Sequence, residues 1–256
     1  MQQSFEAILK IFSISIFRYF LIAGIPFLVC YNLLGKRLIK SKIQKRYAAR
    51  NDFIREIVHS LKTTVIFTAI LYIALYTPFN GLTKIYTDLS EYPLWWLFAS
   101  VVISLIIHDT YFYWMHRLLH HPTIFRYIHL VHHQSTNPSP WASYSFDLIE
   151  AFTEGAVLLV IVIIMPMHLL SIALFLIVAF MINVYGHLGY EIAPMWLRQT
   201  LLFELVNTSV HHNLHHSKFK GNYGLYFRVW DRLMGTEHPD YVKEYDRIQE
   251  NRMKIN

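Results

Sequence analysis

The sequence predicts an all-α protein with about four to five membrane-spanning helices, capped by a helical, histidine-rich metal-binding region on the cytoplasmic side. Composition is the first observation behind this prediction. Hydrophobic residues make up 54% of the chain and charged residues only 16%, whereas an average soluble domain has about 25% charged residues. The second observation is that the apolar residues gather in runs long enough to cross a bilayer. The third is that most of the 15 histidines gather in clusters beside those runs.

Four apolar stretches account for the predicted membrane helices. They comprise residues 11–34, 61–79, 93–115 and 151–185. Each of the first three is close to the ~20 residues needed for one crossing. The fourth falls short of the ~40 residues needed for two full crossings. We therefore expect it to form two short crossings or a hairpin that dips into the membrane.

Residues 35–58 form a basic segment between the first two apolar stretches, with eight Lys and Arg residues against two acidic ones. Such a segment is typical of a cytoplasmic loop that faces anionic headgroups, so we expect a membrane surface and no nucleic acid as its partner. With this loop in the cytoplasm, the 81–92 loop lies outside. Every histidine cluster then lies on the cytoplasmic side.

The first histidine cluster follows the third apolar stretch. His116 and His120 are four residues apart, so they lie on one face of a helix, and Pro122 ends that helix. His108 and Asp109 precede them by two turns. This spacing suits two imidazoles on one metal ion.

The second and third clusters repeat a tighter pattern in which positions i, i+3 and i+4 converge on one side of a helix. The second comprises His129, His132 and His133, and the third comprises His211, His212, His215 and His216. His187 directly follows the last apolar stretch and can reach the same region. For the isolated His59, His168 and His238, and for His121, we expect ordinary polar positions instead.

A metal site explains these clusters better than chance. Charged imidazoles repel one another and packed neutral ones need partners, whereas a bound metal removes both costs. Eight to ten imidazoles suit two ions. Structural zinc sites typically include cysteine, and the only cysteine, Cys30, lies in an apolar span. Imidazole binds zinc, copper, iron and nickel alike, but no HExxH motif supplies the general base of a hydrolytic zinc site.

The clusters resemble the three histidine boxes of the fatty acid hydroxylase / sterol desaturase superfamily, over about residues 95–238. The matching boxes are His116-x3-His120, His129-x2-His132-His133 and His212-x2-His215-His216. The matching flanks are Asp109, Tyr113 to Arg117, Gly186-His187, Gly221 to Gly224 and Trp230 to Thr236. Asp147 stands where sterol desaturases often carry a histidine, which leaves the ligand set open by one.

The resemblance implies a membrane di-iron oxygenase that hydroxylates or desaturates a sterol, a fatty acyl chain or a related lipid. It implies two iron ions, which zinc can replace, and O2 as co-substrate. It also implies two regions, residues 1–92 with the N-terminal membrane helices and the basic loop, and residues 93–256 as the catalytic region. The candidate metal ligands are His108, His116, His120, His129, His132, His133, His187, His211, His212, His215 and His216.

Three acidic residues are candidates for supporting roles. We expect Asp109 either to orient a ligand imidazole through its second nitrogen or to form a salt bridge with Arg117 or Arg126. Glu150 and Glu154 enter an apolar stretch, where acids are costly and often functional. We expect them at the membrane interface, with contact to metal ligands as the alternative.

The chain lacks visible means of delivering electrons to such a site. No GxGxxG motif follows a strand, and no cysteine cluster could hold an iron–sulfur centre. We therefore expect a separate donor, a ferredoxin or a b-type cytochrome with its reductase. Four basic residues near the third cluster would either attract this donor or contact lipid headgroups: Lys218, Lys220, Arg228 and Arg232.

Two other classes of function remain at this stage. One is a zinc-dependent membrane hydrolase, and the other is a non-catalytic metal-binding or transport protein. A transporter should carry its ligands near the bilayer midplane, whereas these histidines follow the ends of the apolar runs.

Overall fold

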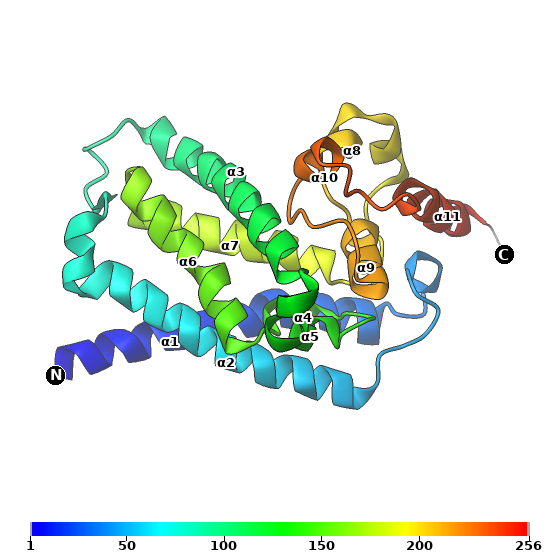
Figure 1. Ribbon diagram of the computed structural model, residues 1–256, viewed down its shortest axis with the longest axis horizontal. Coiled ribbons are helices and arrows are strands. Elements are labelled where there is room, and N and C mark those ends of the chain that lie inside the picture. Colours follow the sequence, from blue (N-terminus) through cyan, green and yellow to red (C-terminus); the bar gives the residue numbers. More distant parts are fainter. Residues whose placement is uncertain (1, 255–256) are drawn as a thin grey trace.

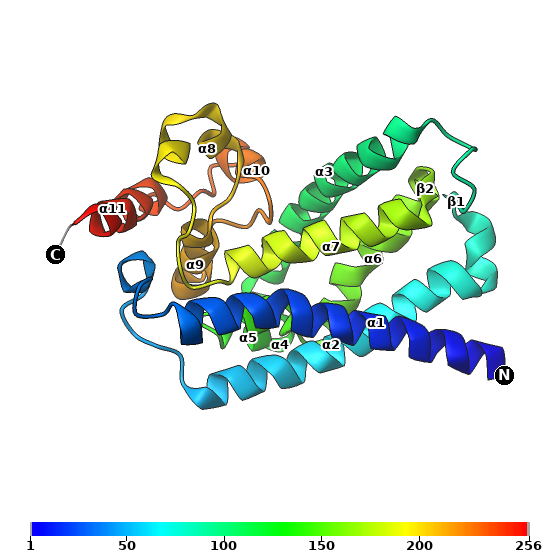
Figure 2. The same cartoon turned by 180° about the vertical axis from the view of Figure 1, so that it is seen from behind.

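Five long helices run side by side as a bundle, and the short C-terminal helices gather at one end of it (Figure 1, Figure 2). The computed structural model describes residues 2–254. The long helices are α1 (Gln2–Phe27), α2 (Arg50–Tyr76), α3 (Leu94–Leu119), α6 (Leu148–Ile164) and α7 (Leu169–Gly186). The short ones are α4 (Pro122–Ile128), α5 (Leu130–His133), α8 (Leu201–Leu205), α9 (Ser209–Lys218), α10 (Val229–Leu233) and α11 (Tyr241–Met253).

The bundle has the dimensions of a multi-pass membrane protein. Four segments are long and apolar enough to cross a bilayer, namely Gln2–Leu33, Arg50–Tyr76, Leu94–Leu119 and Leu169–Gly186. The helix α6 is equally apolar but has only 17 residues, about 26 Å at 1.5 Å per residue. The predicted all-α membrane fold is confirmed.

The fourth apolar stretch forms two helices joined by a tight turn. The turn contains β2 (Met167–His168), which pairs in parallel with β1 (Ile85–Tyr86) from the loop before α3. Within the described part of the chain these two short strands form the only sheet. His168 lies in this turn, where its Nε2 donates to the Thr87 carbonyl oxygen (2.9 Å). His168 thus lies outside the histidine groups, in the ordinary polar position that was expected for it.

The first two helices are longer than their apolar stretches. The helix α2 begins at Arg50 because polar residues continue its first turns, and Asp52 Oδ2 accepts a hydrogen bond from the Ala49 N–H (2.9 Å). The helix α1 begins at Gln2 and continues as a π-helix over Leu28–Leu33. Pro26 lacks an N–H and loosens the helix just before this change.

Close packing of α2 against α6 depends on one glycine. A Cβ atom at Gly155 would clash with the Ile70 side chain and touch the Phe67 ring. The close approach of Gly155 to Ile70 and Phe67 therefore joins α2 to α6.

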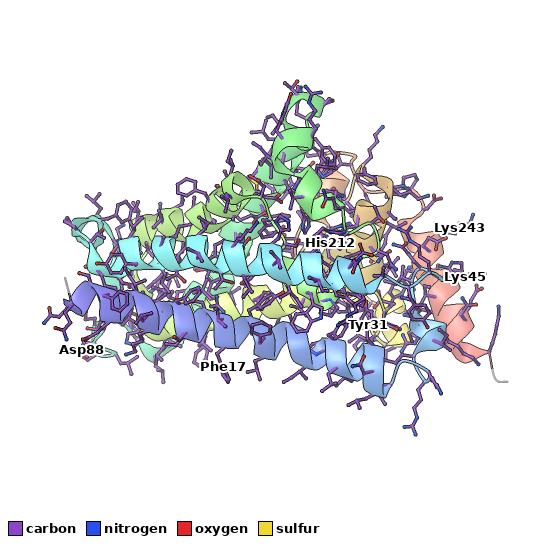
Figure 3. All side chains as sticks on the ribbon, turned by 90° about the horizontal axis from the view of Figure 1, so that it is seen from below. Phe17, Tyr31, Lys45, Asp88, His212 and Lys243 are labelled. Carbon is purple, nitrogen blue, oxygen red and sulfur yellow. The ribbon has the colours of Figure 1, made fainter. Side chains whose placement is uncertain are left out.

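Charged loops mark the two ends of the bundle. Lys45 and Lys243 lie at one end, with His212 nearer to them than to Asp88 at the opposite end (Figure 3). The loop after α1 and the C-terminal helices thus share one end, as the charge pattern predicted. The histidine clusters belong to that end.

Candidate metal centre

Nine buried or half-buried imidazoles form two adjacent groups where α3, α5, α7 and α9 meet. Within each group, one nitrogen of every ring lies within 4.8 Å of the others. Group A comprises His116, His120, His129, His133 and His215, and group B comprises His132, His187, His212 and His216. The structure thus gathers nine of the eleven candidate ligands.

In group A, outward hydrogen bonds determine which ring nitrogens face inward. His116 Nδ1 donates to the Tyr223 carbonyl oxygen (2.9 Å) and His215 Nδ1 donates to the Gly221 carbonyl oxygen (2.7 Å). A carbonyl can only accept, so Nδ1 carries the proton and Nε2 is an unprotonated acceptor. The Nε2 atom of His116 lies 3.0 Å from the Nε2 atom of His129. The Nε2 atom of His215 lies 3.2 Å from the Nε2 atom of His120. Two lone pairs at this distance repel unless a cation lies beside them.

Group B repeats the arrangement around His187. Its Nδ1 donates to the Asn183 carbonyl oxygen (2.9 Å), which leaves Nε2 as an acceptor. That Nε2 lies 3.0 Å from His212 Nε2, 3.2 Å from His216 Nε2 and 3.4 Å from His132 Nε2. The Nε2 atoms of four buried rings therefore share one small space.

The spacing between the rings fits metal coordination. The seven close Nε2–Nε2 distances in the two groups are 3.0–3.4 Å. Nitrogens about 2.1 Å from one ion lie about 3.0 Å apart at a right angle and about 3.4 Å apart at the tetrahedral angle. Each group therefore fits one metal ion, and the whole site fits two.

Burial keeps these rings neutral, which metal binding requires. It lowers the pKa of His187 and of His215 to about 4 each. Burial, reinforced by neighbouring imidazoles, also holds the pKa far below the usual value for His120, His129, His132, His133, His212 and His216. No proton has to leave the inward nitrogens at neutral pH before a metal binds.

Glu150 supports group A from the start of α6. Its Oε1 lies 2.6 Å from His129 Nδ1, and both side chains are buried. A carboxylate there keeps the proton on Nδ1 and turns Nε2 toward the group, as is usual for metal-bound histidine. The expected interfacial position of Glu150 was therefore wrong. An acid placed inside an apolar run was the signal for this role.

The inclusion of His108 among the candidate ligands needs correction. Its ring lies outside both groups, and its Nδ1 is 2.8 Å from the Tyr226 hydroxyl. Eight residues separate His108 from His116 on α3, which places it about 12 Å deeper in the bundle.

His211 also lies outside both groups. Its ring packs against Tyr241 of α11, with the centroids 5.0 Å apart, and its Nε2 lies 3.9 Å from Asp231 Oδ2. On α9, His211 lies about 90° around the axis from the mean direction of the three grouped histidines. The i, i+4 relation to His215 was too coarse to detect this rotation.

Asp109 has a different role from either one expected. Its Oδ1 accepts hydrogen bonds from the backbone N–H groups of Leu225 (3.1 Å), Tyr226 (2.7 Å) and Phe227 (3.2 Å). Among the described residues it forms no hydrogen bond with an imidazole and no ion pair with an arginine. Asp109 therefore anchors the segment that follows Tyr223, whose carbonyl oxygen binds His116.

Asp231 anchors the other side of the same segment. It accepts hydrogen bonds from the N–H groups of Tyr223 (2.9 Å) and Gly224 (2.7 Å) and from the Thr236 hydroxyl (2.7 Å). Two buried carboxylates on different helices thus position the 221–227 segment over group A. Because the carbonyl groups that bind the imidazoles belong to the backbone, no side-chain motif could reveal them.

The four basic residues near the third cluster differ in exposure. Lys218 and Lys220 are exposed. Arg228 is buried, binds both carboxylate oxygens of Glu237 and lies between the rings of Phe203 and Tyr241. Arg228 is therefore a structural residue and cannot attract a partner, contrary to expectation. Arg232 is exposed but bonded to Glu204 (2.7 Å).

An apolar cavity adjoins group B inside the bundle. It is lined from α1, α2, α3, α6 and α7, and its empty volume, including its mouth, is about 730 Å³. Two of its lining residues touch group B: the Phe146 ring lies 5.0 Å from the His132 ring, and the Asn183 carbonyl oxygen binds His187. Helix packing creates this cavity, so periodicity along the sequence could not predict it.

Comparison with known proteins relates the chain to one family of lipid-modifying membrane proteins. Residues 101–236 match the family model described as fatty acid hydroxylase. The chain is 35% identical over 172 residues to Delta(7)-sterol 5(6)-desaturase ERG3B of Gibberella zeae, covering 67% of this chain and 51% of the relative. It is 33% identical over 198 residues to lathosterol oxidase of Mus musculus, covering 74% of this chain and 63% of the relative.

A third relative is named for a different reaction. Methylsterol monooxygenase 1 of Gallus gallus is 32% identical over 166 residues, covering 64% of this chain and 55% of the relative. The chain thus spans between about half and two thirds of the length of these three relatives. No solved structure matches it. Since the family model covers more than half of the chain and includes both histidine groups, the chain belongs to the fatty acid hydroxylase family.

Proposed function

We propose that this protein is a membrane-bound oxygenase that holds two iron ions and oxidises a C–H bond of a lipid, by hydroxylation or desaturation. The observation that carries this proposal is the pair of adjacent groups of imidazoles, five and four in number, whose acceptor nitrogens face inward. The proposed ligands are His116, His120, His129, His133 and His215 for one ion, and His132, His187, His212 and His216 for the other.

Iron is proposed over zinc because of what surrounds the groups. The adjoining cavity is apolar and suits a hydrocarbon, which offers no bond for a zinc hydrolase to cleave. Two iron ions would supply the activation of O2 that oxidation of an unactivated C–H bond requires. The protein's own residues would exclude water, orient the imidazoles through carbonyl oxygens and Glu150, and hold the lipid in the cavity.

A sterol is the substrate class that we propose. The names of the three relatives specify a sterol desaturase, a lathosterol oxidase and a methylsterol monooxygenase. These reactions differ in product but share oxidation of a sterol carbon. The cavity beside group B is the proposed binding place for the sterol.

Electrons would come from a separate ferredoxin or b-type cytochrome with its reductase. Hydroxylation with O2 needs two electrons beyond those taken from the substrate, and the chain carries no second redox centre motif. We place the histidine end of the bundle on the cytoplasmic side because the basic 34–49 loop shares that end. The exposed Lys218 and Lys220 lie beside group A in sequence and would face an acidic donor.

The test is reconstitution of the iron-loaded protein in lipid nanodiscs with lathosterol, O2, NAD(P)H and a reductase and carrier pair. We expect an oxidised sterol only when every component is present. A zinc-loaded sample and a sample without O2 are the controls. Product formed with zinc or without O2 would refute the oxygenase assignment, and sustained turnover without the added carrier would refute the need for a separate donor.

A further inference from the structure

The apolar cavity beside group B is lined by one basic and one acidic side chain. Arg18 enters it from α1 and Glu154 from α6, among lining residues that are mostly aliphatic or aromatic. No ion pair joins the two side chains, and neither forms an ion pair elsewhere in residues 2–254. Charges within a membrane-spanning bundle are costly and are usually paired or functional.

Glu154 is placed one helical turn beyond the metal centre. It follows Glu150 by four residues on α6, so the two side chains share one helix face about 6 Å apart along the axis. Glu150 contacts His129 of group A, whereas Glu154 lines the cavity. Only 9% of Glu154 is exposed, and its carboxyl group has no hydrogen-bond partner among the described residues.

Arg18 lines the same cavity from α1. Its Nε is buried and lacks a hydrogen-bond partner in the described structure. Ser15, one turn earlier on α1, also lines the cavity, whereas the neighbouring Phe17 is 67% exposed and points away from the bundle (Figure 3). Arg18 is therefore half-buried, with its Nε buried and its side chain lining the cavity.

The two charges together select one kind of ligand group. A carboxylate or phosphate would bind Arg18 but be repelled by Glu154, and an ammonium group would have the reverse difficulty. A hydroxyl group can accept a hydrogen bond from the guanidinium and donate one to the carboxylate. Charge-assisted hydrogen bonds of this kind are about twice as strong as neutral ones.

We propose that Arg18 and Glu154 form a hydroxyl-binding subsite that positions a lipid in the cavity beside the metal centre. This subsite rests on the proposed function, because it assigns the cavity to the substrate. The distance between this subsite and the metal centre limits which carbon of the lipid can be oxidised. A bound hydroxyl group would lie about 6–12 Å from the imidazoles, the distance of one to two helical turns. The oxidised carbon must therefore lie within this distance of a hydroxyl group, as the compact ring system of a sterol allows.

The test compares three probes that differ only in the polar group: lathosterol, its 3-ketone and its 3-methyl ether. Equilibrium binding is measured on the full-length, metal-loaded protein in nanodiscs, without turnover. We expect lathosterol to bind at least about tenfold more tightly than the methyl ether, which lacks the donor, with the ketone also weaker than lathosterol. Equal affinities for the three probes would overturn the subsite, and this result needs no variant.

Substitutions of Arg18 and Glu154 test whether these two residues cause the preference for a hydroxyl group. Arg18→Leu and Glu154→Leu should each bring the affinities for lathosterol and its methyl ether to within about twofold of each other. The matched controls are Lys10→Leu, which removes an exposed charge from the same helix as Arg18, and Glu91→Leu, in the exposed loop before α3. Both controls should keep the tenfold preference. A preference that survives in both cavity variants would overturn the assignment.

Two further readouts separate this subsite from the proposed function. Metal content checks that each variant is folded, and sterol oxidation is measured independently of binding. Hydroxyl preference without any oxidation would refute the oxygenase and retain the subsite. Equal oxidation of lathosterol and its methyl ether would refute the subsite and retain the oxygenase.

Discussion

His129 Nδ1 and Glu150 Oε1 lie 2.6 Å apart, and both side chains are fully buried. This contact joins the membrane helix α6 to the short helix α5, which carries two further grouped histidines. It makes the first turn of a bundle helix part of the metal centre. The strength of metal binding is therefore coupled to the packing of α6 against its neighbours.

Replacing Glu150 with alanine should weaken metal binding by about 10- to 100-fold, because the His129 ring loses the acceptor that orients it. The measurement is metal retention during titration with a chelator in detergent. Glu150→Gln keeps an acceptor and should recover much of the loss. Glu154→Ala, one turn away on the same helix, should bind metal as the wild type does. Equal losses for the two alanine variants would contradict the specific role of Glu150.

Neighbouring histidines should differ sharply in their effect on metal content. The His120 ring belongs to group A, whereas His121 is exposed and lies outside both groups. We expect about two ions per chain in the wild type and in His121→Ala, and a second ion that is released more readily to a chelator in His120→Ala, as measured by elemental analysis before and after chelation. Equal retention of the two ions by His120→Ala and the wild type after chelation would show that its ring is dispensable.

A substitution in group B should remove the other ion. His212→Ala deletes a ring whose Nε2 lies 3.0 Å from His187 Nε2. The variant should retain about one ion, in group A. Loss of both ions on this change would mean that the two groups bind metal as one unit and not separately.

Asp109→Ala should destabilise the segment over group A by about 1–3 kcal/mol, because it leaves three buried or partly buried N–H groups without their acceptor. Hydrogen exchange should rise in residues 221–227, with a lower thermal midpoint for the whole protein. Asp88→Ala, in the exposed loop before α3, serves as the control and should change neither quantity. Unchanged protection of residues 221–227 in Asp109→Ala would contradict the anchoring role.

Cysteine labelling should place the basic loop after α1 and the C-terminal helix α11 on one side of the membrane. Lys45 and Lys243 are exposed at the same end of the bundle, and Asp88 lies at the other (Figure 3). In a Cys30→Ser background, an impermeant maleimide should label Lys45→Cys and Lys243→Cys from the cytoplasmic face and Asp88→Cys from the opposite face. Labelling of Lys45→Cys and Lys243→Cys from different faces would contradict the arrangement.

The sequence carried most of the information on the bundle and the nine grouped rings. Apolar runs of bilayer length predicted the long helices, and i, i+3 and i+4 spacing predicted converging imidazoles. Both patterns involve residues that are close together in the sequence, so they can be recognised without knowledge of the fold. The polar first turns of α2 escaped prediction because a helix can extend beyond its apolar stretch when Asp52 caps it.

The features that could not be predicted from the sequence depend on contacts between segments that are distant in the chain. Asp109 meets Tyr226, and Arg228 meets Phe203, only after the C-terminal helices pack onto the bundle. The charge of Arg228 suggested a surface role that Glu237 and two aromatic rings prevent. The type of a residue shows which interactions its side chain can form. The residues around it in the folded protein determine which of these interactions it does form.

Both histidine groups include rings from α9, His215 in one and His212 and His216 in the other. A nascent chain that has emerged only as far as His187, at the end of α7, therefore lacks one of the five rings of group A and two of the four rings of group B. Neither group is complete until the chain has been made as far as Lys218. For the two-ion site that we propose, full coordination of both ions therefore depends on the last helices of the chain, not on the long helices alone.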